Sequence, residues 1–539
     1  MTFRHDSASY RVPAYYAADG DAANSGATGG RIWRCHFVPD RPGEWAYTVS
    51  FRRGANVAVS DHPAAGQPYP DADGRHGRFR VNPAATGQRG RLQFGGRQYP
   101  VWAATGELFY KLGPDAPENL LAYADFDGGF ATDGHKDELV KTWAAHRRDW
   151  RPGDPTWGAD QRGKALIGAV NYLAEAGLNS ISFLTNNITG DDRNVFPYVS
   201  YDDYARLDVS KLAQWAIVLG HAARRGLFLH FKLSEVENQC LLDGGELGPQ
   251  RRLYYREMIA RFGHYPALNW NLGEENGRWA NDYPLLWQTT TQRLAMARYF
   301  RDHDPYGHHR VIHNGQPFYD LAGPESDYTG VSLQTNRADF ANVYPHVRHW
   351  LDLSRSERLG WAVAVDEPGD AEHSLLPDTD DPDHDLARQN ALWGSLLAGA
   401  WGTEWYFGYA HAHSDLTCQD FRSRELFWSQ CSHLKKILEE EKMPLPGMMP
   451  ANALTTADDW VLAHPQGPYL IYRKMGTPTA GAITLPGGRY TLRYYNPRTG
   501  EYTVAGELRS PGPGTALPLP EPPVQLDMDW ALLVSTRKQ

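Results

Sequence analysis

Cysteine is scarce in this sequence, and its spacing excludes two classes of small scaffold. The 539 residues include four cysteines, Cys35, Cys240, Cys418 and Cys431, which lie far apart and form no Cys-x-x-Cys pattern. A structural zinc site or a framework of disulfide bonds needs more closely spaced cysteines. We therefore expect four buried free thiols and a fold that is stabilised by its hydrophobic core.

Long apolar runs and clusters of positive charge are also missing. No stretch approaches the roughly 18–20 apolar residues of a membrane-spanning helix. The formal net charge is -10, and no run of Lys and Arg offers a surface for nucleic-acid phosphates. Residues 1–30 lack the apolar core of a secretion signal. We expect neither a membrane nor a nucleic acid as partner. The location expected from the sequence as it stands is cytoplasmic, or extracellular or periplasmic if the true start lies upstream.

Aromatic residues, in contrast, are abundant, with 18 Trp, 29 Tyr and 19 Phe. Aromatic faces stack on the C–H faces of sugars, but they also fill large cores. The count by itself therefore favours a carbohydrate-handling protein only slightly. A chain of 539 residues is long enough for several domains.

Three regions of the sequence differ in their residue pattern. Residues 1–95 and 445–539 consist of short strand-like runs between Gly, Pro and Asp turns, which predicts a small β-sandwich at each end. Residues 96–444 alternate helical patterns with short apolar runs. Helices are predicted over 161–176, after Asp208, and from Pro249 to Gly263.

Eight candidate strands lie in the middle region, and helices separate most of them. The strands are expected near residues 107–112, 179–185, 227–233, 268–273, 309–313, 329–334, 361–366 and 401–407. Eight such units are typical of a (β/α)8 barrel. A doubly wound sheet would have similar spacing, but no Gly-rich phosphate loop follows an early strand. We predict an α/β protein in which a (β/α)8 TIM barrel is flanked by two small all-β domains.

Carboxylates follow two of these strands. Glu274 and Glu275 come after the fourth strand, and Glu367 ends the seventh. The active-site residues of such barrels lie at the C-terminal ends of the strands. Acidic groups next to a buried strand cost free energy when they have no partner. Strands four and seven face each other across the barrel mouth. One carboxylate from each, about 5–5.5 Å apart, is what a retaining glycosidase requires.

Other strand ends carry amides, imidazoles, a lysine and aromatic rings, a set suited to hydroxyl-rich ligands. For each of them a structural role is an equal alternative. The candidate substrate-binding residues are Asn186, Asn187, His230, Lys232, Glu235, Glu274, His313, Gln334, Glu404, Trp405 and Tyr406.

Metal binding is not favoured by the sequence. His411, His413 and Asp415 could be read as ligands, but the chain has 21 histidines and no HExxH helix. The acidic loop 377–385 lacks the spacing of an EF-hand. We expect no metal and no cofactor.

Four stretches of the sequence resemble a known family, and together they extend over most of the chain. They are residues 33–54, 117–129, 228–277 and 404–425. They resemble bacterial glycoside hydrolases with an N-terminal domain of unknown function, an apiosidase-like barrel and a C-terminal β domain named for collagen binding. The barrel is also similar to the clan A type of retaining glycosidases, which carry the acid/base on strand four and the nucleophile on strand seven. The resemblance implies that Glu275 is the acid/base and Glu367 the nucleophile.

One departure from that clan concerns the residue before the acid/base, which is usually Asn and here is Glu274. Either Glu274 or Glu275 could point inward, and we favour Glu275. The resulting hypothesis is a retaining glycoside hydrolase that acts on an oligo- or polysaccharide. The alternatives are a non-catalytic carbohydrate-binding or scaffold protein, and a polysaccharide lyase with His313, Tyr406 or Lys232 as its base. The last domain is expected to brace the barrel or to bind carbohydrate.

Overall fold

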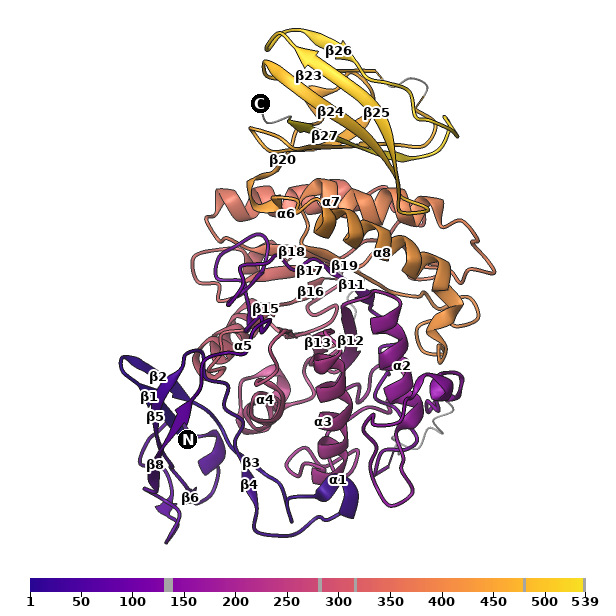
Figure 1. Cartoon of the computed structure of the whole chain (residues 1–539). Coiled ribbons are helices and arrows are strands. Elements are labelled where there is room, and N and C mark those ends of the chain that lie inside the picture. The colour runs from indigo at the N-terminus through magenta and orange to yellow at the C-terminus, as the bar shows by residue number, and fades with distance from the viewer. Residues whose placement is uncertain (130–138, 280–283, 315–317, 478–480, 537–539) are drawn as a thin grey trace.

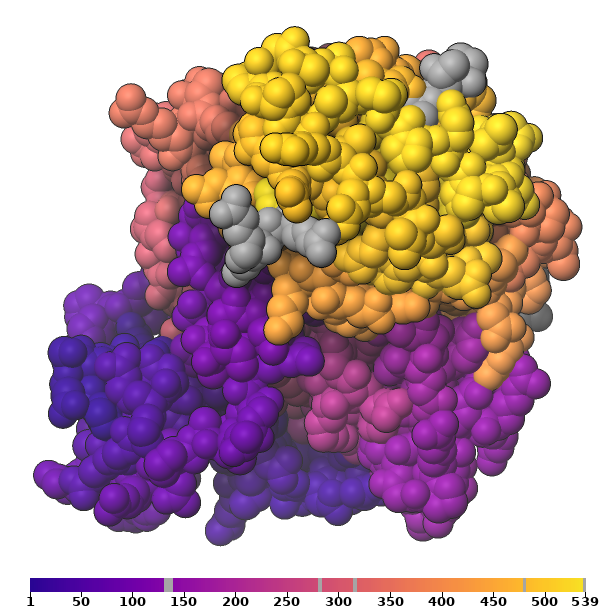
Figure 2. All heavy atoms as spheres, turned by 45° about the horizontal axis from the view of Figure 1, so that its top comes forward, coloured from indigo at the N-terminus to yellow at the C-terminus, as the bar shows by residue number. Residues whose placement is uncertain are grey.

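The computed structural model describes residues 1–129, 139–279, 284–314, 318–477 and 481–536. It has a mixed α/β architecture in which a middle region of alternating strands and helices separates two β regions (Figure 1). The C-terminal β region, in yellow, covers one end of the molecule (Figure 2). Within the described ranges, no helix is both long enough and apolar enough to cross a bilayer.

The N-terminal region contains a four-stranded antiparallel sheet in the order β2-β1-β5-β8 and three two-stranded sheets, β3-β4, β6-β7 and β9-β10. Trp45 of β5 is fully buried against the four-stranded sheet, and the ring of Phe37 stacks on Phe3 with 4.1 Å between centroids. A segment around Phe37 therefore covers the sheet where we expected the second sheet of a sandwich. The elements are β1 (Thr2–His5), β2 (Ala8–Arg11), β3 (Tyr15–Tyr16), α1 (Ala22–Ser25), β4 (Trp33–Arg34), β5 (Gly43–Thr48), β6 (Arg52–Arg53), β7 (Gln67–Pro68), β8 (His76–Val81), β9 (Leu92–Gln93) and β10 (Val101–Trp102).

The strands of the middle region form two parallel sheets, β11-β19-β18-β17-β16 and β12-β13-β14-β15. Their buried, largely apolar sequences are typical of parallel strands that are covered on both faces. The strands are β11 (Lys111–Pro114), β12 (Ser180–Leu184), β13 (Phe228–Lys232), β14 (Leu268–Asn271), β15 (His309–Val311), β16 (His313–Asn314), β17 (Gly330–Gln334), β18 (Ala362–Glu367) and β19 (Gly402–Trp405).

The two parallel sheets meet at both edges. Only Ile312 separates β15 from β16, so one stretch of chain belongs to both sheets. At the other edge, the backbone N–H of Asn179 donates to Leu112 O over 2.9 Å, and the Asn179 side-chain oxygen accepts from Leu112 N over 2.8 Å. Gly113 allows this approach, since a Cβ there would lie 2.0 Å from Ser180 O. The order of the strands is therefore cyclic.

Seven of the eight predicted strands lie where the apolar runs placed them, and the first does not. The prediction was 107–112, whereas β11 covers Lys111–Pro114. Glu107 and Leu108 instead run back along Val101 and Trp102, with Trp102 N donating to Glu107 O over 2.9 Å. The first residues of the predicted strand thus belong to a local hairpin and not to the buried strand.

Helices cover the outside of these strands (Figure 1). The Asp208 side chain accepts a hydrogen bond from Lys211 N and caps α3, as predicted. Pro249 occupies the first turn of α4, where its missing N–H costs no hydrogen bond. The helices are α2 (Lys164–Glu175), α3 (Val209–Arg224), α4 (Pro249–Phe262), α5 (Thr290–His303), α6 (Val343–Ser356), α7 (Gly394–Ala398) and α8 (Glu425–Glu440).

The C-terminal region is an antiparallel sheet in the order β20-β21-β22-β27-β24-β25, with β23 and β26 as a separate pair. The turn predicted after Asn496 is confirmed, because it joins β24 to β25. Helices α6, α7 and α8 lie between this sheet and the parallel strands (Figure 1). The strands are β20 (Met449–Pro450), β21 (Asp459–Ala463), β22 (Tyr469–Arg473), β23 (Ala482–Thr484), β24 (Gly488–Asn496), β25 (Glu501–Ser510), β26 (Ala516–Pro518) and β27 (Trp530–Thr536).

A buried ion pair joins the C-terminal region to the middle region. Arg388, in the π-helical segment before α7, donates from Nε and Nη2 to the two oxygens of Asp529 over 2.9 and 2.8 Å. Neither side chain is accessible to solvent. Burial lowers the pKa of Arg388, but hydrogen bonding to Asp529 and its charge outweigh that effect and raise it above its ordinary value. Arg498 adds a second cation, 2.7 Å from Asp529.

We expect Arg388→Met to lower the free energy of unfolding by about 3 kcal/mol, because it leaves Asp529 buried with one partner fewer. Chemical unfolding followed by circular dichroism measures this change. The matched control is Arg493→Met, since Arg493 is part of a partly exposed pair with Glu441. Such a pair contributes less than about 1 kcal/mol. Equal losses in the two variants would contradict a special role for the buried pair.

Candidate active site

The carboxyl ends of β14 and β18 bring their glutamates to the same end of the strands. Glu367 is the last residue of β18 and lies in register with Gln334 of β17. The Gln334 side chain donates from Nε2 to Glu275 Oε1 over 2.5 Å. Gln334 therefore links the loop after β14 to the end of β18.

The backbone of Glu275 adopts a left-handed conformation, with φ at 47°. Such a conformation is uncommon outside glycine and costs energy, which the surrounding structure must offset. Trp279 Nε1 donates to Glu275 O over 3.2 Å and helps to hold this turn. Strained backbone of this kind gathers at functional sites, so the conformation supports a functional role for Glu275.

The protonation of Glu275 depends on its surroundings. Burial raises the pKa of Glu275 well above its usual range, and the negative charge of Glu367 raises it further. The hydrogen bond from Gln334 acts in the opposite direction but is outweighed. A carboxylic acid that keeps its proton near neutral pH can act as a general acid.

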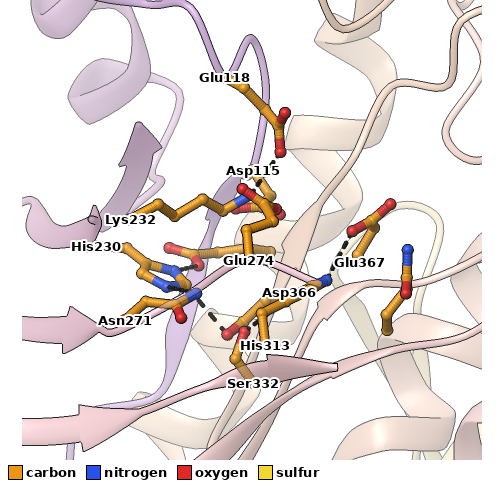
Figure 3. A network of polar contacts seen from close by, with 12 residues as sticks. Asp115, Glu118, His230, Lys232, Asn271, Glu274, His313, Ser332, Asp366 and Glu367 are labelled. Carbon is orange, nitrogen blue, oxygen red and sulfur yellow. Dashed lines mark hydrogen bonds and ion pairs between the residues drawn. The ribbon is translucent and has the colours of Figure 1, made fainter. Parts of the chain in front are cut away.

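Glu367 lies beside a histidine whose orientation is fixed (Figure 3). His313 Nε2 is 2.8 Å from Glu367 Oε2, a close contact that lacks the angles of a hydrogen bond. On the other side of the ring, Nδ1 is 3.0 Å from Ser332 Oγ. His313 thus presents a ring nitrogen directly to the carboxylate of Glu367.

Lys232 is the cation at the centre of this site (Figure 3). Its Nζ donates to Asp115 Oδ2 over 3.0 Å, to Glu118 Oε1 over 2.9 Å, and to Glu274 Oε1. Burial lowers the pKa of Lys232, but the three carboxylates outweigh burial and raise it well above its ordinary value. The Glu274 carboxylate is therefore held by the Lys232 ammonium, whereas that of Glu275 accepts a hydrogen bond from the neutral amide of Gln334.

A second buried network lies deeper along the strands. Lys111 Nζ is 2.5 Å from Asp366 and 2.9 Å from Glu404, and His230 Nδ1 is 2.6 Å from Glu404. His230 is two residues before Lys232 on β13, hence on the same face and further from the mouth. Fully buried, this network supports the site from below.

Among the residues that the structure describes, two groups of side chains have atoms close enough to hold a metal ion. They are Glu274, His313 and Glu367, and Asp115, His230 and Glu404, each within 4.8 Å. Oxygen and imidazole ligands suit zinc. In each group, however, a lysine already contacts a carboxylate. Lys232 contacts Glu274 in the first group and Asp115 in the second, and Lys111 contacts Glu404 in the second. These ammonium groups supply positive charge where a metal would supply it and would repel a further cation.

Comparison with known proteins identifies solved structures of similar fold. Residues 1–52 match the family model described as Domain of unknown function (DUF5060). A candidate glycoside hydrolase from Bacteroides vulgatus ATCC 8482 is similar in structure, with a TM-score of 0.64, 16% identity, and coverage of 99% of this chain and 94% of that one. This chain therefore shares its fold with that protein. Similarity at this identity extends to the fold alone.

Two further structures agree. A glycoside hydrolase family 5 protein from the same organism has a TM-score of 0.57 and 15% identity, covering 84% of this chain and 94% of that one. A protein named glycoside hydrolase has a TM-score of 0.56 and 14% identity, covering 84% and 98%. No curated protein sequence matches this chain.

The predicted substrate-binding residues differ in their exposure to solvent. Gln334 and Tyr406 retain some exposure to solvent. Burial raises the pKa of Tyr406, and the charges of Asp415 and Glu367 raise it further. All nine of the others are almost completely buried. These buried residues are Asn186, Asn187, His230, Lys232, Glu235, Glu274, His313, Glu404 and Trp405.

Sequence reasoning missed two acids of the site, Asp115 and Glu118. Both follow β11 and contact Lys232. The rule that strand ends carry the functional residues would have indicated Asp115 if the first strand had been placed correctly. The signal was present in the polar residues that follow Leu112, Gly113 and Pro114.

Proposed function

We propose that this protein is a retaining glycoside hydrolase that cleaves an oligo- or polysaccharide. In this proposal the cyclic strand order is a (β/α)8 TIM barrel, with residues 1–95 and 445–539 as flanking all-β domains. The observation that carries the proposal is the pairing of two carboxyl groups at the same end of the strands, Glu275 after β14 and Glu367 at the end of β18, with Gln334 between them. Glu275 has a raised pKa, caused by burial and then by the charge of Glu367.

In the first step, Glu367 attacks the anomeric carbon and the bond to the leaving oxygen breaks. Glu275 transfers its proton to that oxygen, so the leaving group departs as an alcohol. The sugar is then bound to Glu367 as an ester, and Glu275 carries a negative charge. In this step His313, beside Glu367, is placed to stabilise the attacking carboxylate.

In the second step, water replaces the enzyme at the anomeric carbon. Glu275 accepts a proton from that water, which then attacks and releases Glu367 as a carboxylate. The esterified Glu367 has no charge, so it no longer raises the pKa of Glu275 by repulsion. The loss of that charge favours the ionised form of Glu275 when it must act as a base, and two inversions give net retention.

Glu275 is assigned the acid/base role in preference to Glu274 because of their partners. Glu274 contacts the Lys232 ammonium, whose positive charge favours the ionised form. Burial, and then the charge of Glu118, nevertheless raise the pKa of Glu274. Glu274 is thus one member of a buried network of charged side chains. Glu275 is bound by an amide and is more exposed than Glu274, so it can reach a substrate.

The pH dependence of hydrolysis follows from the raised pKa of Glu275. Because the acid form is needed, we expect kcat/KM to fall as pH rises through that pKa. An activated aryl glycoside, whose leaving group needs no proton, should lose much less activity over the same range. Comparing the two pH profiles in wild type measures this difference. Superimposable alkaline limbs would contradict the role of Glu275 as general acid.

A reducing-end assay across plant, algal and bacterial polysaccharides tests the proposal as a whole. We expect one class of glycan to be cleaved, and proton NMR at early times to show a product that keeps the anomeric configuration. Inversion would contradict the double displacement. Glycan binding with no product would indicate a binding protein, and an ultraviolet-absorbing unsaturated product would indicate a lyase.

A further inference from the structure

A pocket of about 340 Å³ adjoins the loop that carries Glu275. Asn276 and Gly277, which follow Glu275 directly, form part of its wall, and Phe318 and Asp320 after β16 form another part. This volume lies at the lower end of the roughly 300–1,000 Å³ range of small-molecule sites. Because Glu275 protonates the leaving oxygen in the proposed reaction, a pocket against its own loop lies on the leaving-group side. This location rests on the proposed function.

An ion pair with unused hydrogen-bonding groups lines this pocket. Arg293 Nη2 donates to Asp320 Oδ2 over 2.7 Å, and Thr290 Oγ1 donates to the same oxygen. Asp320 Oδ1 is therefore left to accept from a ligand, and the side chain of Asp320 is 41% exposed. Arg293 Nη1 lies beside Gly277, where a Cβ would be 3.2 Å from it. Because Gly277 has no side chain, the space next to this donor stays clear.

The charges that line the pocket favour an uncharged ligand. Asp320 neutralises the positive charge of Arg293, and its carboxylate would repel an entering carboxylate or sulfate group. Arg278 also lines the pocket, but its guanidinium packs 4.8 Å from the centre of the Trp287 ring and makes a further interaction. Sugar hydroxyls both donate and accept, so two adjacent hydroxyls can bind Arg293 Nη1 and Asp320 Oδ1 at once.

Trp287 supplies an aromatic surface in the same pocket. It lies on the loop between β14 and α5 and is 37% exposed. The C–H face of a pyranose ring packs on an indole, while its hydroxyls remain free for polar partners. An exposed ring near a donor and an acceptor is thus the combination that binds a neutral sugar.

The wall after β13 also disfavours an anionic sugar. Glu235 follows β13, the strand beside β14, and is almost completely buried. Burial raises the pKa of Glu235 well above its usual range, and the negative charge of Glu118 raises it further. A carboxylate or sulfate group on the substrate would be repelled by the same charge that disfavours ionisation of Glu235.

We propose that this pocket is a leaving-group subsite for a neutral sugar, which binds Arg293 Nη1 and Asp320 Oδ1 through adjacent hydroxyls and stacks on Trp287. The substrate is then a neutral polysaccharide, and cleavage leaves an uncharged unit at the new end of the leaving fragment. Discrimination against acidic glycans comes from the Asp320 carboxylate, which neutralises the arginine and repels a second anion.

Calorimetric binding to the Glu367→Gln variant tests the subsite without turnover. The neutral probes are cellotriose, xylotriose, mannotriose and galactotriose, and the anionic probe is trigalacturonic acid. We expect at least one neutral probe to bind about tenfold or more tightly than trigalacturonic acid. If no neutral probe binds more tightly than trigalacturonic acid, the subsite is overturned.

Asp320→Asn, made in the same background, should shift the preference towards the anion. It removes the charge that neutralises Arg293, so the affinity for trigalacturonic acid should rise severalfold. The affinity for the neutral probe should fall severalfold, because an amide oxygen is a weaker acceptor than a carboxylate. Glu325→Gln is the matched control, since Glu325 is an exposed acid 3.8 Å from Arg298, and should change neither affinity. Equal effects in Asp320→Asn and Glu325→Gln would overturn the role of the ion pair.

Trp287→Ala tests the aromatic surface separately. The ring is partly exposed, so its removal should weaken binding of the neutral probe severalfold without lowering the melting temperature. Unchanged affinity for the neutral probe in this variant would overturn the stacking contact.

The outcomes distinguish this inference from the proposed function. Binding of a neutral sugar that depends on Asp320, without hydrolysis of any glycan by wild type, would leave the subsite standing and refute the hydrolase. Hydrolysis of neutral glycans at full rate in Asp320→Asn and Trp287→Ala, with Glu367 intact, would leave the hydrolase standing and refute the subsite.

Discussion

Glu367→Gln is expected to reduce kcat/KM by about 10⁴-fold or more, because an amide cannot replace the attacking carboxylate. Glutamine has nearly the same shape and can keep the contact with His313, so the fold should survive. The reducing-end assay measures this loss on the glycan that wild type cleaves. A variant with full activity would refute the double-displacement mechanism.

Two controls make the result specific. Glu372→Gln changes an exposed acid in the loop after β18 and should leave kcat/KM unchanged. Glu367→Gly with added azide should recover part of the lost rate and form a glycosyl azide of inverted configuration, because the small anion takes the place of the missing carboxylate. Equal losses in Glu367→Gln and Glu372→Gln would indicate damage to the loop and not to the nucleophile.

Lys232→Met is expected to lower the free energy of unfolding by about 3–5 kcal/mol, because it leaves buried carboxylates without their cation. Asp115, Glu118 and Glu274 all contact Lys232 Nζ, and Lys232 itself has no solvent exposure. Chemical unfolding at neutral pH measures the change. An effect below about 1 kcal/mol, as for an exposed pair, would contradict the central role of Lys232.

The loss should depend on pH. Without Lys232, the buried acids have folded-state pKa values above those of the unfolded chain, so they favour folding at low pH and disfavour it as pH rises through the folded values. The deficit relative to wild type should therefore be small in acid and largest at neutral pH and above. Lys211→Met is the matched control, since this buried lysine binds the carbonyl oxygens of Phe196 and Tyr198. A deficit in Lys232→Met that does not change with pH would contradict the electrostatic explanation.

Much of the fold could be predicted because its signals are local. The cap at Asp208, the proline that opens α4 and the turn after Asn496 each depend on a few neighbouring residues. Apolar runs likewise placed seven of the eight predicted strands correctly. The early placement of β11 had a consequence for the site, because it hid Asp115 and Glu118 from the rule on strand ends.

The pairing within the site could not be predicted, since it joins residues that are distant in the sequence. Lys232 was taken as a sugar contact, whereas it binds carboxylates 114 and 117 positions earlier in the chain. Lys111 and Glu404, 293 positions apart, meet only when β11 lies beside β19. Residue types at strand ends indicated a polar mouth, but only tertiary structure decides which charges neutralise one another.

The position of β27 has a consequence for the order in which the protein is made. This strand lies between β22 and β24 in the C-terminal sheet, although both are synthesised before it. While the ribosome is still translating the residues of β27, the sheet lacks an inner strand, and β22 and β24 each present an unpaired edge that invites aggregation. Asp529 lies just before β27 and emerges from the ribosome at the same late stage. Until then, Arg388 lacks the carboxylate that it binds in the folded protein.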